Sequence, residues 1–262
     1  MSAAARLLRY QLRDVIRSRW LVVYALLFLV LTDALFRFGG SGSRVILSLT
    51  NVVLALIPLV SIVFGTMYLY NAREFIELML TQPVGRRSLF AGLYGGLAVP
   101  LSAAFAVGVG VPFAIHGGIA GQAAGFAMLI GSGVLLTLVF TALAVLVALR
   151  FQDRAMGLGA AILIWLFAAV LYDGLLLLLV AWFRDYPLES PVLVATLLNP
   201  VDLGRVLLLL QFDLSALLGY TGAVFERFFG SGTGTWVSLA ALSLWVMLPL
   251  AGGLRMFRRK DW

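Results

Sequence analysis

Long apolar runs, interrupted by short polar or charged stretches, dominate this chain. Six runs approach or exceed the length that an α-helix needs to cross the hydrocarbon core of a bilayer, about 20 residues. They cover residues 20–36, 45–70, 93–115, 122–149, 157–182 and 235–256. The pattern predicts an all-α integral membrane protein with six transmembrane helices, built as one transmembrane domain over residues 1–262.

Composition supports this prediction, and charge gives it an orientation. Hydrophobic residues make up 62% of the 262 residues and the mean hydropathy is +1.04, which is more apolar than a soluble domain can bury. If the amino terminus is cytoplasmic, most of the 19 Lys and Arg residues fall in cytoplasmic segments, as the positive-inside rule favours. Both termini are therefore expected inside. The net charge of +7 then serves orientation and contact with lipid headgroups, not nucleic-acid binding.

The segment before the first span, residues 3–19, carries arginines every three or four positions, opposite a stripe of apolar residues. This spacing predicts an amphipathic elbow helix that lies along the inner membrane surface. A basic flank that only orients the chain is the alternative.

The segment between the second and third spans has the sequence NAREFIELMLTQPVGRRSLF. Its apolar residues predict a short helix that ends before Pro83. Glu74 and Glu77 lie near the helix start, where the helix dipole favours acidic side chains. A short, charged, exposed helix between two spans suits docking by another protein; a simple connecting loop is the alternative.

The outer segment, residues 183–234, is too apolar for a disordered linker. Within its NPVD sequence, Pro200 suits the first position of a helix, and Asn199 suits the cap before it. We expect one or two short extracytoplasmic helices, packed on or dipping into the outer membrane face.

Two acidic residues interrupt the apolar runs, where an unpaired charge is costly. Asp33 has Arg37 one turn later, so an i,i+4 ion pair is the simplest explanation for it. Asp173 has no such neighbour in its own run, which favours a cavity-facing position or a partner from another segment.

Candidate chemistry for an enzyme or a metal centre is sparse. The chain has no Cys, and a lone His116 cannot form a metal centre by itself. The seven Met residues do not cluster as a soft Cu(I) site requires. Lys260 is the only lysine, so a phosphate-binding loop with its essential lysine is missing. We therefore predict no catalytic residues, no metal site and no cofactor bound by this chain.

Four short sequences occur in order along the chain: DVIRSRW, ELMLTQPVGRRSLF, NPVD and FRRKDW. Together they resemble permease subunits of type 2 ABC exporters over nearly the whole chain, and among these most resemble the NosY-like permeases of nitrous oxide reductase maturation. The resemblance implies a homodimer of six-helix subunits in the bacterial inner membrane. Each subunit would dock on a separate cytoplasmic ATPase, which holds ATP and Mg.

The resemblance also implies roles for particular residues. The helix from Glu74 to Gln82 would be the coupling helix that sits in a cleft of the ATPase. The residues expected to act in this coupling are Glu74, Glu77, Gln82, Pro83, Arg86 and Arg87. The first, second and fifth spans would line the dimer interface where a small polar or cationic cargo passes. The candidate pathway residues are Asp33, Asn51, Met67 and Asp173.

Three other functions fit the same sequence. The chain could be a permease of a generic drug or lipid exporter. It could be a non-transporting scaffold that transmits ATP-driven motion to a periplasmic partner on its outer segment. A membrane enzyme is the third, although the spans show no constellation of catalytic acids and bases.

Overall fold

In the computed structural model, the described residues are Val15 and residues 18–39, 42–82, 85–117, 122–183, 189–210 and 233–259. Every regular element in these ranges is helical. The elements are α2 (Arg19–Gly39), α3 (Gly42–Asn71), α4 (Arg73–Leu80), α5 (Arg86–Ile115), α6 (Ala123–Arg150), α7 (Arg154–Leu166), the π-helix η1 (Phe167–Leu171), α8 (Tyr172–Trp182), α9 (Glu189–Leu197), α10 (Pro200–Leu210) and α12 (Thr233–Arg259). The predicted elbow helix lies almost entirely outside the described residues.

Six of the described helices are long and apolar enough to cross a membrane, which confirms the predicted all-α membrane fold. They are α2, α3, α5, α6, the continuous helix Arg154–Trp182 and α12. We call Arg154–Trp182, which contains α7, η1 and α8, span five. The third span begins at Arg86, earlier than the apolar run at residue 93, because the helix starts directly after the extended residue Gly85.

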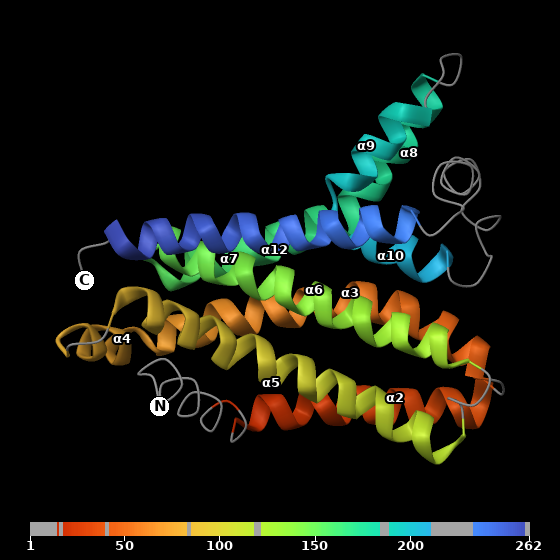
Figure 1. Ribbon diagram of the computed structural model, residues 1–262, viewed down its shortest axis with the longest axis horizontal. Coiled ribbons are helices and arrows are strands. Elements are labelled where there is room, and N and C mark those ends of the chain that lie inside the picture. Colours follow the sequence, from red (N-terminus) through yellow and green to blue (C-terminus); the bar gives the residue numbers. More distant parts are fainter. Residues whose placement is uncertain are drawn as a thin grey trace.

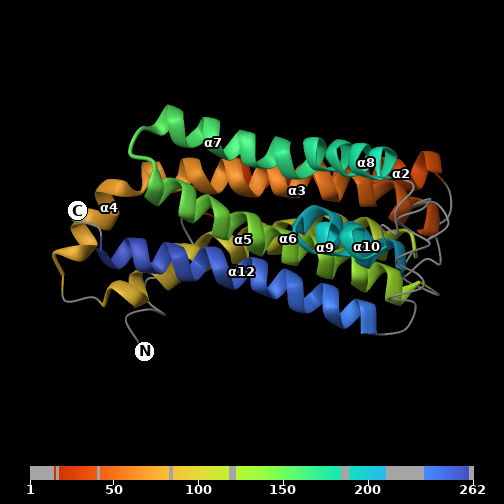
Figure 2. The same ribbon diagram turned by 90° about the horizontal axis from the view of Figure 1, so that it is seen from above.

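The bundle is organised around α6. This helix packs against α3, α5 and α12, while α2 packs against α5 and α3 also contacts α7 (Figures 1 and 2). Glycines permit the closest crossings. A Cβ at Gly108 of α5 would lie 2.7 Å from the Ala25 carbonyl oxygen of α2, and one at Gly65 of α3 would lie 2.8 Å from the Ala144 Cβ of α6.

One end of the bundle gathers the elements that the sequence places in the cytoplasm. The whole of α4, the amino end of α5 and the carboxyl end of α12 lie together at the left of Figure 1, and the amino end of α2 points toward them. Arg86, Arg150, Arg154 and Arg258 belong to helix termini at this end. We call it the arginine-rich end.

Span five bends away from the bundle at η1. Beyond the bend, α8 projects outward and α9 contacts it (Figure 1). The pair Pro191–Leu197 and Pro200–Leu208 is bent by 104°. α10 begins at Pro200 and packs back on α3, α6 and α12. The expected short helices before the last span are thus α9 and α10, at the end opposite α4.

Candidate functional site

α4 is a short helix with one buried and one exposed face. Ile76 is only 3% exposed and anchors α4 to the bundle. Glu74 and Glu77 are exposed, and Leu78 beside them is 63% exposed. An exposed leucine beside two carboxylates, on a helix outside the spans, is suited to contact with another protein.

The remaining residues expected in coupling follow α4 in the chain. The helix ends at Leu80, two residues before the predicted Gln82, where the Thr81 hydroxyl donates to the Leu78 carbonyl at 2.8 Å. Gln82 and Arg87 are exposed. Arg86 Nη1 donates to the Arg258 carbonyl oxygen at 2.6 Å, which attaches the start of α5 to the carboxyl end of α12. Pro83 lies outside the described residues.

The junction of α3 and α4 is hydrogen-bonded to the connection that precedes span five. The Tyr70 hydroxyl donates to the Phe151 carbonyl oxygen at 2.9 Å, and Arg73 Nη1 donates to the Gln152 carbonyl oxygen at 3.0 Å. The Arg73 guanidinium also lies 5.6 Å from the centre of the Tyr70 ring, within the range of a cation–π contact. We call Tyr70, Arg73, Phe151 and Gln152 the inner clasp.

The inner clasp adjoins a rigid helix start. Asp153 caps α7 by accepting from the amide of Ala155 at 2.6 Å and from that of Met156 at 3.1 Å. The Tyr70 hydroxyl also packs so closely on Gly157 that any Cβ there would collide with it. The clasp therefore holds the first turn of span five as well as the loop before it.

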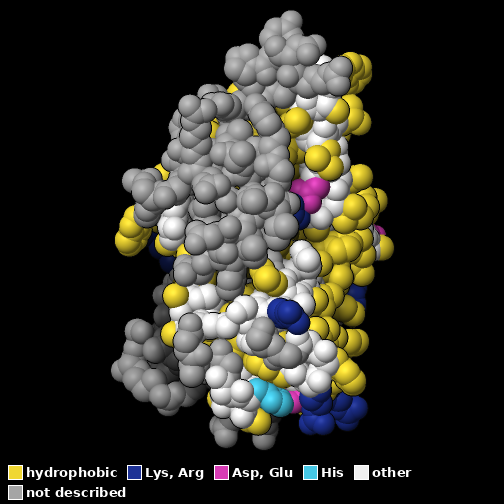
Figure 3. All heavy atoms as spheres, turned by 90° about the vertical axis from the view of Figure 1, so that its right-hand side faces the viewer, with side chains coloured by type: hydrophobic (Ala, Val, Ile, Leu, Met, Phe, Trp, Pro, Cys, Tyr) yellow, Lys and Arg dark blue, Asp and Glu magenta, His cyan; other side chains and the backbone are white. Residues whose placement is uncertain are grey.

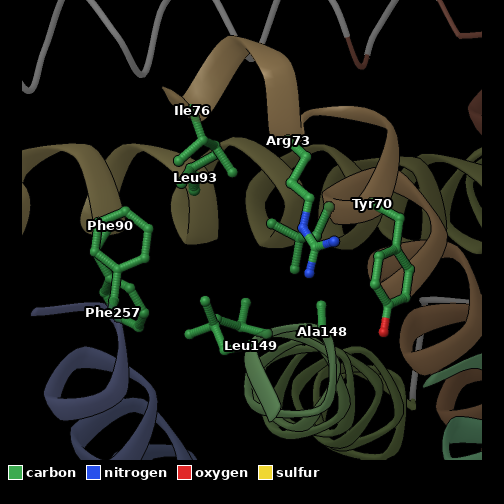
Figure 4. A pocket seen from close by; sticks show the side chains of 10 residues that line it. Tyr70, Arg73, Ile76, Phe90, Leu93, Ala148, Leu149 and Phe257 are labelled. Carbon is green, nitrogen blue, oxygen red and sulfur yellow. The ribbon is translucent and has the colours of Figure 1, made fainter. Parts of the chain in front are cut away.

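A small cavity lies beneath α4, and Arg73 points into it (Figure 4). Apart from Arg73 and Tyr70, its lining is apolar. The other lining residues are Leu69, Ile76, Phe90, Leu93, Val145, Ala148, Leu149 and Phe257. Arg73 Nη2 is buried here without a hydrogen-bond partner. The cavity marks an incompletely packed seam between α4 and the bundle.

A second polar cluster joins span five to α9 and α10. Arg205 of α10 lies 2.7 Å from the Asp173 carboxylate of α8 and 3.2 Å from Asp202. The Tyr172 hydroxyl donates to the Ala195 carbonyl oxygen of α9 at 2.5 Å. Span five is therefore attached to both outer helices.

Asn199 completes this second cluster from the turn between α9 and α10. Its side-chain oxygen accepts from the Val201 amide at 3.1 Å, the capping bond expected at the start of α10. Its amide nitrogen donates to the Ala168 carbonyl oxygen of η1 at 2.8 Å and to Asp202 at 3.0 Å. We call Tyr172, Asp173, Asn199, Asp202 and Arg205 the outer clasp.

Comparison with known proteins decides the class of this molecule. The family model described as ABC-2 family transporter protein matches residues 6–262. The chain belongs to the ABC-2 transporter family. It is also 30% identical, over 96% of both chains, to a probable ABC transporter permease protein NosY of Pseudomonas aeruginosa. A protein of the same description from Stutzerimonas stutzeri is 28% identical over 81% of this chain and 83% of its own length.

The molecule is thus the transmembrane permease subunit of an ABC transporter, as the sequence resemblance implied. The likeness to the Pseudomonas aeruginosa protein covers 96% of the chain, and the range matched by the family model includes every candidate span. In this permease, the inner clasp and the exposed face of α4 lie at one end of the bundle, whereas the outer clasp lies at the bend of span five.

The candidate cargo residues of the permease do not form one site within a subunit. Asp33 is paired with Arg37 at 2.7 Å, as expected, and also with His116 at 2.8 Å. Figure 3 shows the histidine beside acidic and basic side chains at the end of the molecule opposite α4. Asp173 has its own partner, Arg205, on a different helix.

The other two candidates, Asn51 and Met67, are both exposed on α3. Sixteen residues separate them, which corresponds to about 24 Å along a helix. Any pathway that these four residues line in the permease must therefore run along the bundle instead of enclosing a compact pocket. Among the described residues, no group of three or more His, Cys, Asp or Glu is placed to hold a metal ion.

The inner clasp was not found from the sequence. Arg73 contributed to the cytoplasmic positive charge, and Tyr70 marked only the end of an apolar run. Both donate to backbone carbonyls, which carry no side-chain signal. The outer clasp had two visible signals, the unpaired Asp173 and the NPVD sequence, but nothing in the sequence connected them.

Proposed function

We propose that this permease converts ATP-driven closure of a separate cytoplasmic ABC ATPase into movement of its transmembrane helices. The observation that carries the proposal is the exposed face of α4, with Glu74, Glu77 and Leu78, at the arginine-rich end. In this role α4 is the coupling helix and fits a cleft of the ATPase. Gln82, Pro83, Arg86 and Arg87 then guide the chain from the ATPase into α5. ATP and Mg are bound by the ATPase.

The proposed location is the bacterial inner membrane, with both termini cytoplasmic. The gathering of arginines at the end that contains α4 supports this orientation, because basic residues are retained on the cytoplasmic side. The same end would face the ATPase.

The proposed assembly is a homodimer that uses α2, α3 and span five. These helices are neighbours, since α3 contacts both α2 and α7. Only 6% of an 18-residue apolar stretch of span five is buried, against 67% of the equivalent stretch of α6. α2 exposes an apolar stripe at three- and four-residue spacing, formed by Trp20, Val23, Leu27 and Val30. A second copy would cover these faces.

The proposed cargo is a small polar species. The alternative is that the permease moves no cargo and transmits movement to a periplasmic partner bound on α9 and α10. The likeness to permeases called NosY supports a place in the maturation of nitrous oxide reductase. Uptake of cargo by inverted vesicles separates transport from pure transmission of movement.

The proposal is tested by coexpressing the chain with a candidate cytoplasmic ABC ATPase and measuring copurification and ATP hydrolysis. Glu77→Arg reverses a charge at the centre of the exposed α4 face, so we expect ATPase stimulation to fall about tenfold while membrane insertion is retained. The matched control is Arg44→Glu, a charge reversal at an exposed position near the opposite end. Wild-type stimulation in Glu77→Arg would contradict the role of α4.

A further inference from the structure

We infer that span five carries the movement of α4 to α9 and α10, acting as a strut that is held by the inner clasp at its start and by the outer clasp at its bend. This inference rests on the proposed function, because α4 must receive the movement of the ATPase. It assigns positioning roles to Tyr70, Arg73, Asp173 and Arg205.

The strut is gripped at its inner end by hydrogen bonds to backbone. Tyr70 and Arg73 bond to the carbonyls of Phe151 and Gln152, immediately before the capping residue Asp153. Backbone carbonyls cannot rotate away as side chains do, so a displacement of the first turn of α4 is passed to the start of α7. The bond from the charged guanidinium is of the stronger, charge-assisted kind.

Span five packs on α3 and α6 along one face, and its other face is exposed. Its apolar stretch is the least buried among those of the six candidate spans. Trp165 Nε1 donates to the Ala55 carbonyl oxygen of α3 at 3.0 Å and attaches the middle of the strut to the bundle. We assign this contact as the pivot about which span five tilts.

The π-helix η1 follows this pivot directly. A π turn holds one residue more than an α turn, has less favourable geometry and often occurs at functional positions. In this turn the Ala168 carbonyl oxygen accepts from Asn199. A change in the π turn therefore moves the cap of α10 as well as the direction of α8.

The outer clasp receives the movement. The Asp173–Arg205 ion pair and the bond from Tyr172 to the Ala195 carbonyl oxygen join α8 to both outer helices. The end of α9 is also attached to α12, through a 3.2 Å bond from Trp245 Nε1 to the Leu197 carbonyl oxygen. A tilt of span five thus pulls α9 and α10 against their contacts with α12, on the side of the molecule away from the ATPase.

The test is hydrogen–deuterium exchange of the peptides covering residues 189–210, in the complex of the permease with its ATPase in nanodiscs. Exchange is compared without nucleotide and after trapping with ATP and vanadate. In the wild type we expect trapping to change exchange in these peptides. In Tyr70→Phe, which removes one hydroxyl, we expect this change to be lost while exchange without nucleotide is unaltered. Asp173→Asn should also lose the change.

Matched controls exist for both variants. Tyr94→Phe removes a similar hydroxyl bond, from Tyr94 to the Leu138 carbonyl oxygen, that lies between α5 and α6 and off the strut. Arg37→Gln removes the Arg37–Asp33 ion pair, which lies off the strut. Both controls should respond to nucleotide as the wild type does. A full response in Tyr70→Phe and Asp173→Asn, or no response in the wild type, overturns the strut. Failure of the wild type to copurify with the ATPase would instead overturn the proposed function.

Discussion

At the scale of single residues, Asn199 shows how a buried polar side chain specifies this fold. It is only 2% exposed, yet its oxygen and nitrogen both have partners, on α10 and on η1. A buried amide is tolerated only when it is satisfied in this way, because an unpaired polar group away from water is costly. The position of one side chain thus sets where α10 starts relative to span five.

Replacement of this amide by an apolar side chain of similar size provides a test. Asn199→Leu leaves the Val201 amide and the Ala168 carbonyl without their partner, so we expect a loss of about 1–3 kcal/mol in the free energy of unfolding. The thermal midpoint of the purified protein in detergent measures it. Asn51→Leu replaces an exposed amide on α3 and is the control. Equal effects of the two variants would contradict a structural role for Asn199.

At the scale of helices, close crossings decide how the elements meet. Gly133 of α6 faces the Phe105 ring of α5 and the Ile57 side chain of α3. Two positions earlier on the same helix, Gly131 has nothing within 4 Å of a Cβ built there. The two glycines look alike in the sequence, and only the packing distinguishes them.

This contrast predicts opposite effects of the same substitution. Gly133→Ala inserts a methyl group into a filled crossing, and we expect it to destabilise the protein by about 1–3 kcal/mol. Gly131→Ala meets no neighbour and should be neutral or slightly stabilising, because Ala favours helix more than Gly does. Unfolding of both variants in parallel measures the difference. A smaller effect at Gly133 than at Gly131 would show that the crossing is wider than described.

At the scale of the whole molecule, the exposed apolar faces are distributed unevenly. α6 is the centre of the bundle, while span five lies at its margin with almost no burial. In the proposed homodimer, span five of each subunit would be buried at the interface between the two copies. The periphery of α12 would instead contact lipid.

Cysteine cross-linking tests this arrangement. Because the chain has no native Cys, only the introduced cysteine can react with the cross-linker. Leu163 of α7 and Met247 of α12 are both 65% exposed. With a short bis-maleimide in native membranes, Leu163→Cys should give a covalent dimer, since equivalent positions near a two-fold axis approach each other. Met247→Cys should remain monomeric. The reverse pattern on denaturing gels would move the interface to α12.

Much of the architecture follows from the sequence by itself. The spans, the short helix around Glu74 and Glu77 and the start of α10 at Pro200 depend on local hydropathy, caps and helix breakers, which a linear pattern records. The pairing of Asp33 with Arg37 is also local, because four residues make one helical turn. The membrane-permease class was recognisable for the same reason.

Only the tertiary structure decided what connects the two ends of the molecule. Tyr70 and Phe151 are 81 residues apart, and their contact depends on how α3 and α7 are rotated and packed. The same holds for Asp173, which has no partner in its own apolar run and is paired with Arg205 of α10. The π turn in FAAVL is as apolar as the helix around it, so no pattern of hydropathy marks it. Hydropathy determines which segments enter the membrane, whereas side-chain packing between distant segments determines which of them move together.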